Sequence, residues 1–346
     1  MSLLMDFTPN GYLSLSNSSV LRSHFLKKLS EAPDIGGSRL LMNRKEHTML
    51  EACLADFFYA HTMLLFNSEF NANVSFFSCI PQPGDSIDER VGLRIGESSL
   101  FLFRESLYSI DGMFTPLREI ADLLEKTFSL KKGYLVIDEA HATEIYGPQR
   151  RGCDMLLGLD RHFWKSFGCN WRSVFQDFKF TLNLLNPFLI DYSVVVVMTT
   201  LTQDYLLNYA QSLIYTTSLS YSNIVAADCS FDMLIDGTAQ HPLMELWKIS
   251  PALVSLPLHF QPPSTLMSGH PSPIIPVLHS THVCSLVPPY ALTLLALGIN
   301  ARPIMWPTVL KGKNHVCMCL HSGNIRDDID HFVDGIVTWA EDTLKV

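Results

Sequence analysis

The fold class is decided by the stretch Val136-Ile137-Asp138-Glu139-Ala140-His141. The apolar run Tyr134–Ile137 predicts a buried strand that ends at Asp138. Open α/β sheets bind ligands at the carboxyl ends of their strands, so this stretch places a carboxylate where a ligand is expected. A carboxylate there can hold a protonated ring nitrogen, and the histidine that follows can reach the same ligand.

Two other interpretations suit this stretch when it is considered alone. A strand end with solvated charges explains the residues equally well. The second motif of a DEAH-type helicase has a similar sequence. Such an enzyme also needs a glycine-rich phosphate loop ending in Lys-Ser or Lys-Thr, and the sequence contains no such loop. The missing loop excludes the helicase, and the stretch alone leaves the solvated strand end open.

Helical and strand-like stretches alternate along the chain, which is the pattern of an α/β fold. Apolar residues at helical spacing predict one helix face over 50–58, and a second helix is expected from Pro116, with Thr115 as its cap. A further strand is expected at Val194–Val197 and a last helix from about Asp327. The helix face over 50–58 consists of Leu50, Cys53, Leu54, Phe57 and Phe58.

The proline-rich stretch Pro242–Pro276 is poorly periodic, so we expect a change of domain between Leu234 and Pro273. The predicted organisation is an N-terminal segment (1–40), a large domain (41–240) and a small C-terminal domain (241–346).

Composition narrows the classes of partner. With 25 basic and 34 acidic residues the formal charge is −9, and without a basic stripe nucleic acid is not an expected partner. The longest apolar run, Val194–Met198, is too short to span a bilayer, and Met1–Leu15 lacks the pattern of a signal peptide. A cytoplasmic protein without a membrane partner is expected. The eight cysteines include no C-x-x-C pair and are expected to be reduced thiols, with no metal site.

Several segments, in a fixed order over most of the chain, resemble the α-oxoamine synthases, the pyridoxal-phosphate enzymes that join an amino acid to an acyl-CoA. The likeness is strongest to the branch that condenses alanine with pimeloyl-CoA, or with the carrier-protein thioester, in biotin synthesis. Besides the aspartate–histidine stretch, the segments are Asp6–Leu13, Gly36–Leu41 with His47 and Leu50-Glu51, Leu65–Asn73, Glu105–Gly112 with Pro116-Leu117, Leu213–Leu219, and Arg302-Pro303 with Pro307–Val309.

The resemblance implies fold type I: a mainly parallel sheet with helices on both faces and a smaller C-terminal α/β domain. It also implies a homodimer with active sites at the subunit interface and pyridoxal phosphate held by a lysine as a Schiff base. Asp138 would pair with the pyridine nitrogen and keep it protonated. His141 and Ser109 would hydrogen-bond the phenolic oxygen of the ring. We therefore expect these three residues to converge on one cavity.

The remaining site residues are implied by the same resemblance. Arg302 would bind the carboxylate of the amino acid, with Thr308 and Asn10 also in the substrate site. The phosphate-binding residues would be the backbone N–H groups of Ser68, Glu69 and Phe70, with Thr216 or Thr217 reaching a phosphate across the dimer.

Four features depart from the family pattern. Glu69 and Glu144 stand where the family has glycine. A carboxylate ~4 Å from a phosphate charge costs about 4 kcal/mol at an effective dielectric constant of ~20. Between Asp85 and Glu105 the chain is several dozen residues shorter than the pattern, so the fold is internally truncated and the histidine that stacks on the ring is absent.

The fourth departure concerns the Schiff-base lysine, which belongs in a Thr-Phe-x-Lys-Ala context before the strand at Val194. The candidate there is Lys179, with Lys165 as a weaker one, and Arg161–Ser193 has no family likeness. The alternatives to an active synthase are a catalytically inactive relative or partner subunit, the product of a mispredicted reading frame or decaying gene, and another pyridoxal-phosphate aminotransferase. The opening motif disfavours the aminotransferase. We expect little or no synthase activity.

Overall fold

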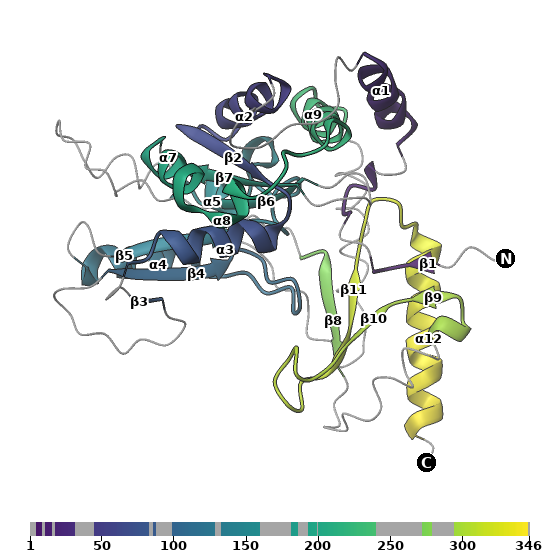
Figure 1. The fold of residues 1–346 in the computed structure, drawn as a ribbon. Helices are drawn as coiled ribbons and strands as arrows, with labels where there is room; N and C mark the ends of the chain where they lie inside the picture. The colour runs from purple at the N-terminus through teal and green to yellow at the C-terminus, as the bar shows by residue number, and fades with distance from the viewer. Residues whose placement is uncertain are drawn as a thin grey trace. The chain divides into compact units, whose positions relative to one another are not determined.

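A computed structural model describes residues 5–8, 11–15, 18–31, 45–82, 86–87, 99–128, 133–159, 181–185, 193–198, 200–239, 272–278 and 294–344. The chain groups into two units (Figure 1). The larger comprises Leu15–Ser106 and Thr115–Gly237, and the smaller comprises Met1–Ser14, Leu107–Phe114 and Thr238–Val346. The sequence-based limits at 40 and 240 stay a prediction.

A sheet in the order β2-β7-β6-β5-β4-β3 forms the centre of the larger unit. Strands β3 to β6 pair in parallel, and β7 is antiparallel to both of its neighbours, β6 and β2. Among the described strands of this sheet, β7 alone runs against the others, which confirms the predicted mainly parallel α/β fold. The strands are β2 (Thr62–Phe66), β3 (Ser86–Ile87), β4 (Leu100–Glu105), β5 (Gly133–Asp138), β6 (Thr181–Leu185) and β7 (Ser193–Met198).

Helices cover both faces of this sheet. Residues Met63–Phe66 of β2 are all at most 1% exposed, although alternate residues of a strand point to opposite faces. On one face Leu64 and Phe66 belong to a core with Phe76 and Leu206. The helices of this unit are α1 (Ser19–Ser30), α2 (Lys45–Phe57), α3 (Glu69–Cys79), α4 (Leu117–Thr127), the 3₁₀ turn η2 (Pro148–Arg150), α5 (Cys153–Leu156), α7 (Thr200–Tyr209), α8 (Gln211–Ile214) and α9 (Tyr221–Ile235).

Two local predictions need correction. Thr115 does not cap α4: its hydroxyl donates to the backbone oxygen of Glu105 at 2.5 Å, and Pro116 occupies the cap position without a side-chain bond. Cys53 is exposed, whereas its predicted partners on the face of α2 are buried. The strands at Tyr134–Ile137 and Val194–Val197 are confirmed as parts of β5 and β7.

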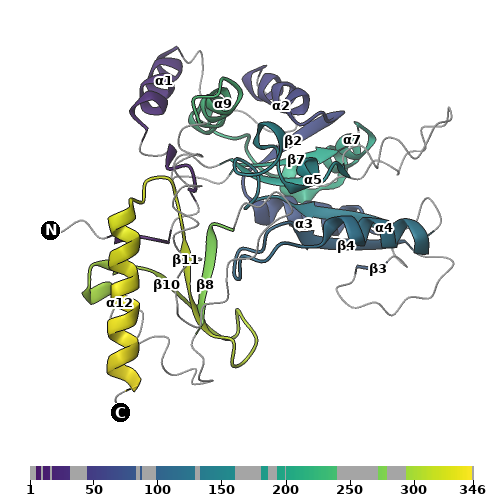
Figure 2. The same ribbon diagram turned by 180° about the vertical axis from the view of Figure 1, so that it is seen from behind.

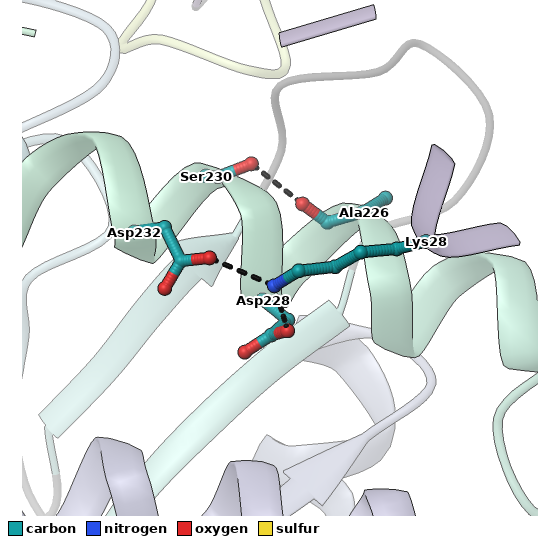
Figure 3. Close-up of polar contacts among 5 residues, drawn as sticks. All are labelled: Lys28, Ala226, Asp228, Ser230 and Asp232. Atoms are coloured by element: carbon teal, nitrogen blue, oxygen red, sulfur yellow. Dashed lines mark hydrogen bonds and ion pairs between the residues drawn. The ribbon is translucent and has the colours of Figure 1, made fainter. Parts of the chain in front are cut away.

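Helix α1 is joined to α9 by an ion pair, which Figure 3 shows in close-up. The Nζ atom of Lys28 lies 2.5 Å from Asp228 and 2.7 Å from Asp232, one turn apart on α9. Desolvation lowers the pKa of Lys28, but the hydrogen bonds and charges of the two aspartates outweigh it and raise the pKa above its ordinary value. All three side chains are partly exposed, so the contact fastens α1 at the surface of the unit.

The smaller unit has a three-stranded antiparallel sheet in the order β10-β11-β8, and a parallel pair of β1 and β9. Its core includes Phe7 and Phe332, which are fully buried with ring centroids 5.3 Å apart. Within the described part of the chain, no helix is long and apolar enough to cross a membrane. The elements are β1 (Met5–Asp6), β8 (Ile274–Leu278), β9 (Ile299–Asn300), β10 (Arg302–Ile304), β11 (His315–Cys319) and α12 (Arg326–Leu344), the predicted last helix, which Figure 2 shows from behind.

Candidate functional site

Asp138 is the last residue of β5 and lies at the carboxyl end of the parallel strands. Its side chain is 4% exposed, and its Oδ1 atom accepts the N–H of Ala140 at 2.9 Å. Its backbone oxygen accepts the N–H of Ser106, which follows β4, at 2.8 Å. These bonds fix the carboxylate in a place shielded from water, at the edge of the sheet where ligands bind.

Glu139 organises the loop that follows β5, and sequence reasoning assigned it no role. It is fully buried and accepts three hydrogen bonds: from the Ser106 hydroxyl at 2.8 Å, the Cys153 N–H at 2.9 Å and the Asp154 N–H at 2.8 Å. A side chain at Gly152 (φ +114°) would meet the Glu139 carboxylate at 2.7 Å. The carboxylate therefore caps the start of α5 and holds both ends of the loop together.

His141 lies in this loop, three residues after Asp138. Desolvation by the surrounding protein lowers its pKa from 6.5 to about 4. At neutral pH the imidazole is therefore neutral, with one N–H donor and one acceptor nitrogen. A neutral ring can donate a hydrogen bond to a ligand oxygen without adding a positive charge to the site.

Glu144 has a left-handed backbone (φ +73°), which explains why glycine suits this position in the family pattern. Its N–H donates to the backbone oxygen of Arg150 at 2.9 Å. Burial raises the pKa of the Glu144 carboxyl from 4.5 to about 8, although the charge of Arg150 opposes the rise. Arg150 is itself 5% exposed and donates to the backbone oxygen of Leu234 at 2.9 Å. The departure at position 144 thus introduces backbone strain together with a partly buried acid whose charged form is disfavoured.

The candidate phosphate site is the turn between β2 and α3. Ser68 is the N-cap of α3, and its Oγ atom accepts the N–H of Asn71 at 3.2 Å. Asn67 donates to the hydroxyl of Thr216 at 3.1 Å, so Thr216 lies beside the turn of its own chain. A helix N-terminus offers N–H groups and a favourable dipole to an anion. Strand β2 runs in the same direction as β5, so this turn and Asp138 both lie at the carboxyl ends of the parallel strands.

The other predicted site residues are distributed as follows. Thr217 and the exposed Phe70 also belong to the larger unit, and the structure describes the backbone of Glu69 in the first turn of α3. Ser109, Arg302 and Thr308 belong to the smaller unit, where Arg302 and Thr308 are exposed. The convergence of Ser109 with Asp138 and His141 stays a prediction. Asn10, Lys165 and Lys179 lie outside the described residues.

The described residues of the larger unit fit pyridoxal phosphate. A buried carboxylate suits a protonated ring nitrogen, a neutral imidazole suits a phenolic oxygen, and the N-terminus of α3 suits a phosphate. All three groups follow the carboxyl ends of parallel strands of the sheet.

The chain is similar to known proteins over nearly its whole length, although no family model matches it. It is 32% identical over 391 residues to the 8-amino-7-oxononanoate synthase of Emericella nidulans, covering 97% of this chain and 89% of that protein. It is 26% identical to the aminoacyl transferase sphA of Aspergillus fumigatus, covering 99% of this chain and 82% of that one. The alignment with the synthase spans 391 positions and this chain has 346 residues, so at least 45 positions of the relative have no counterpart here.

Among solved structures, a variant of serine palmitoyltransferase from S. paucimobilis with a bound PLP–myriocin aldimine superposes with a TM-score of 0.81. The identity is 18%, and the match covers 99% of this chain and 89% of the transferase chain. A likeness at this identity shows the fold, and it agrees with the mainly parallel sheet and the smaller unit described above.

Proposed function

The chain belongs to the α-oxoamine synthase family of pyridoxal-phosphate enzymes, and from this membership we propose that its site is built to condense an amino acid with an acyl-CoA thioester. The finer proposal is an 8-amino-7-oxononanoate synthase-like reaction of biotin synthesis, in which alanine and pimeloyl-CoA combine with loss of carbon dioxide. A homodimer is part of the proposal. The observation that carries it is the buried Asp138 carboxylate at the carboxyl end of β5, 4% exposed and fixed by the N–H of Ala140.

Each residue has a stated task in this proposal. Pyridoxal phosphate, when bound, supplies an electron sink for a negative charge at the α-carbon of the amino acid. Asp138 keeps a proton on the ring nitrogen, because a carboxylate with little access to water interacts strongly with a positive neighbour. His141 donates its N–H to the phenolic oxygen. The N–H groups at the start of α3 bind the phosphate, and Arg302 binds the carboxylate of the amino acid.

A second candidate is a family member that keeps the fold and catalyses little or nothing. The observations that favour it are the left-handed backbone of Glu144 with the raised pKa of its carboxyl, the acid at position 69 and the lost lysine context. The acid at position 69, the absent ring-stacking histidine and the lost lysine context concern one cofactor in the family pattern, so their effects are expected to compound. The lysine serves both as covalent anchor and as base, so its loss alone would nearly abolish turnover.

A cofactor titration followed by an activity assay separates the two candidates. An active synthase gives an absorbance band near the edge of the visible range on addition of pyridoxal phosphate, bleached by borohydride, and turnover with alanine and pimeloyl-CoA. We expect little or no turnover. Turnover that is abolished by Lys179→Ala and kept in the matched control Lys165→Ala would contradict this expectation and identify Lys179 as the catalytic lysine.

A further inference from the structure

Strand β2 is the open edge of the six-stranded sheet, because its described neighbour is β7 on one side alone. The backbone groups of Met63 and Leu65 point away from β7, since alternate residues of a strand direct their N–H and C=O groups to the same side. Both residues are at most 1% exposed, so water does not satisfy these groups. A buried N–H without a partner costs about 1–3 kcal/mol, and each outward group therefore needs a side chain.

Two helices supply those side chains. Glu51 of α2 accepts the N–H of Leu65 with its Oε1 atom at 2.8 Å, and Glu51 is 7% exposed. Gln203 of α7 donates to the backbone oxygen of Met63 at 3.0 Å. Two of the outward groups, the N–H of Leu65 and the backbone oxygen of Met63, are thus bonded by one carboxylate and one amide, each from a different helix.

His47 supports Glu51 from the preceding turn of α2. Its side chain is fully buried, and its Nε2 atom lies 3.4 Å from Oε1 of Glu51. Among the described residues, neither ring nitrogen of His47 has a hydrogen-bond partner. The carboxylate is therefore the polar group toward which this buried ring is directed, and the ring restricts where the carboxylate can move.

The bond to Leu65 lies three residues before Ser68, the N-cap of α3. The chain between them contains Phe66, which is 1% exposed, and Asn67, whose side chain donates to Thr216. A strand end that is fixed at Leu65 fixes the direction in which this turn leaves the sheet. The direction of the turn decides where the first N–H groups of α3 point.

We propose that Glu51 is a positioning residue for the candidate phosphate turn, acting through the N–H of Leu65 and supported by His47. This proposal rests on the proposed function only in assigning the phosphate of pyridoxal phosphate to that turn. The carboxylate touches neither cofactor nor substrate. It holds the end of β2 so that the N-terminus of α3 is ready for the anion before binding.

The test compares three variants by hydrogen exchange without cofactor. Glu51→Met keeps the length of the side chain and removes the acceptor, whereas Glu51→Gln keeps an acceptor oxygen. Gln203→Met is the matched control, because it removes the other edge bond without touching Leu65. We expect Glu51→Met to speed exchange of the Leu65 and Asn71 amides at least tenfold, and Glu51→Gln and Gln203→Met to leave both near the wild-type rate. If Glu51→Met does not fold, Glu51→Asp, one methylene shorter, replaces it.

A second measurement follows the dissociation constant for pyridoxal phosphate by absorbance. We expect a rise of tenfold or more in Glu51→Met and little change in Glu51→Gln. If the Leu65 amide of Glu51→Met exchanges at the wild-type rate, the proposal is overturned. Faster exchange at Leu65 with an unchanged rate at the Asn71 amide also overturns it. An equal loss of cofactor affinity in Gln203→Met would mean general loosening of the edge and would also overturn it. A wild-type protein that binds no pyridoxal phosphate refutes the proposed function instead, and the exchange of Leu65 and Asn71 still decides the role of Glu51.

Discussion

Replacing Glu144 by glutamine should make the protein more stable above neutral pH. The carboxyl of Glu144 has a pKa of about 8 in the folded chain, against 4.5 for its ordinary value, because burial disfavours its charged form. Between these two pH values the folded chain binds more protons than the unfolded chain. The stability that depends on the protonated Glu144 carboxyl is therefore fully present below pH 4.5 and is lost as the pH rises through about 8.

The size of the effect follows from the shift. Each pKa unit is worth about 1.4 kcal/mol, so the shift removes about 3 kcal/mol of stability at pH 7. This is an upper value, because the side chain keeps some access to solvent. Glycine at this position also removes the left-handed strain, worth about 1–2 kcal/mol, but it adds unfolded-state entropy worth about 0.5–1 kcal/mol. Glutamine removes the titration alone, so it is the cleaner change.

The assay is urea unfolding of wild type, Glu144→Gln and Glu144→Gly at pH 5 and pH 8, followed by fluorescence. We expect the stability advantage of Glu144→Gln over wild type to grow by about 3 kcal/mol between these pH values. Glu144→Gly should show the same growth with a further gain of up to about 1.5 kcal/mol at both pH values. Parallel pH profiles for wild type and Glu144→Gln would refute the reasoning, since a carboxyl that titrates normally contributes no such difference.

Four further predictions concern single side chains. The stability of His141→Gln relative to wild type should rise by about 2 kcal/mol between pH 6.5 and pH 5, because a folded-state pKa lowered to about 4 makes the contribution of His141 fall with pH through that range. An NMR titration of the ring should have its midpoint near pH 4. Glu139→Leu should cost 3 kcal/mol or more in urea unfolding, at about 1 kcal/mol or more for each of its three lost hydrogen bonds, and Glu139→Gln less. Lys28→Met should cost about 1 kcal/mol, and the difference should shrink in ~1 M salt; an undiminished difference would contradict an ionic origin. Glu69→Gln should lower the dissociation constant for pyridoxal phosphate tenfold or more by removing a like charge, and an unchanged constant would mean that the carboxylate points away.

The fold and part of the site could be predicted from local pattern. A short apolar run ending in a charge predicts a strand and its end, so Asp138 was placed correctly at the end of β5. Helical spacing predicts a buried face, and Leu50, Leu54 and Phe57 are buried as expected. The family pattern marks position 144 as one that suits glycine, and the left-handed backbone of Glu144 supplies the physical reason.

The hydrogen-bond partners of polar side chains could not be predicted, because they depend on which segments the fold brings together. Threonine is a residue type that often caps helices, but the fold places the Thr115 hydroxyl beside the backbone oxygen of Glu105, at the end of β4, and the hydroxyl donates to it instead. Glu139 looks like a solvated acid in the sequence and is fully buried, because Ser106 and the start of α5 surround it.

The bond between Glu51 and Leu65 shows the same difference between what local pattern predicts and what the fold brings together. By itself the sequence determined the helix that carries Glu51, since apolar periodicity is a property of neighbouring residues. Only the tertiary structure decided that β2 is the edge of the sheet and that its outward N–H, 14 positions from Glu51 in the chain, needs that carboxylate. An unpaired backbone group appears only when the strands are assembled, so no local pattern can reveal its partner.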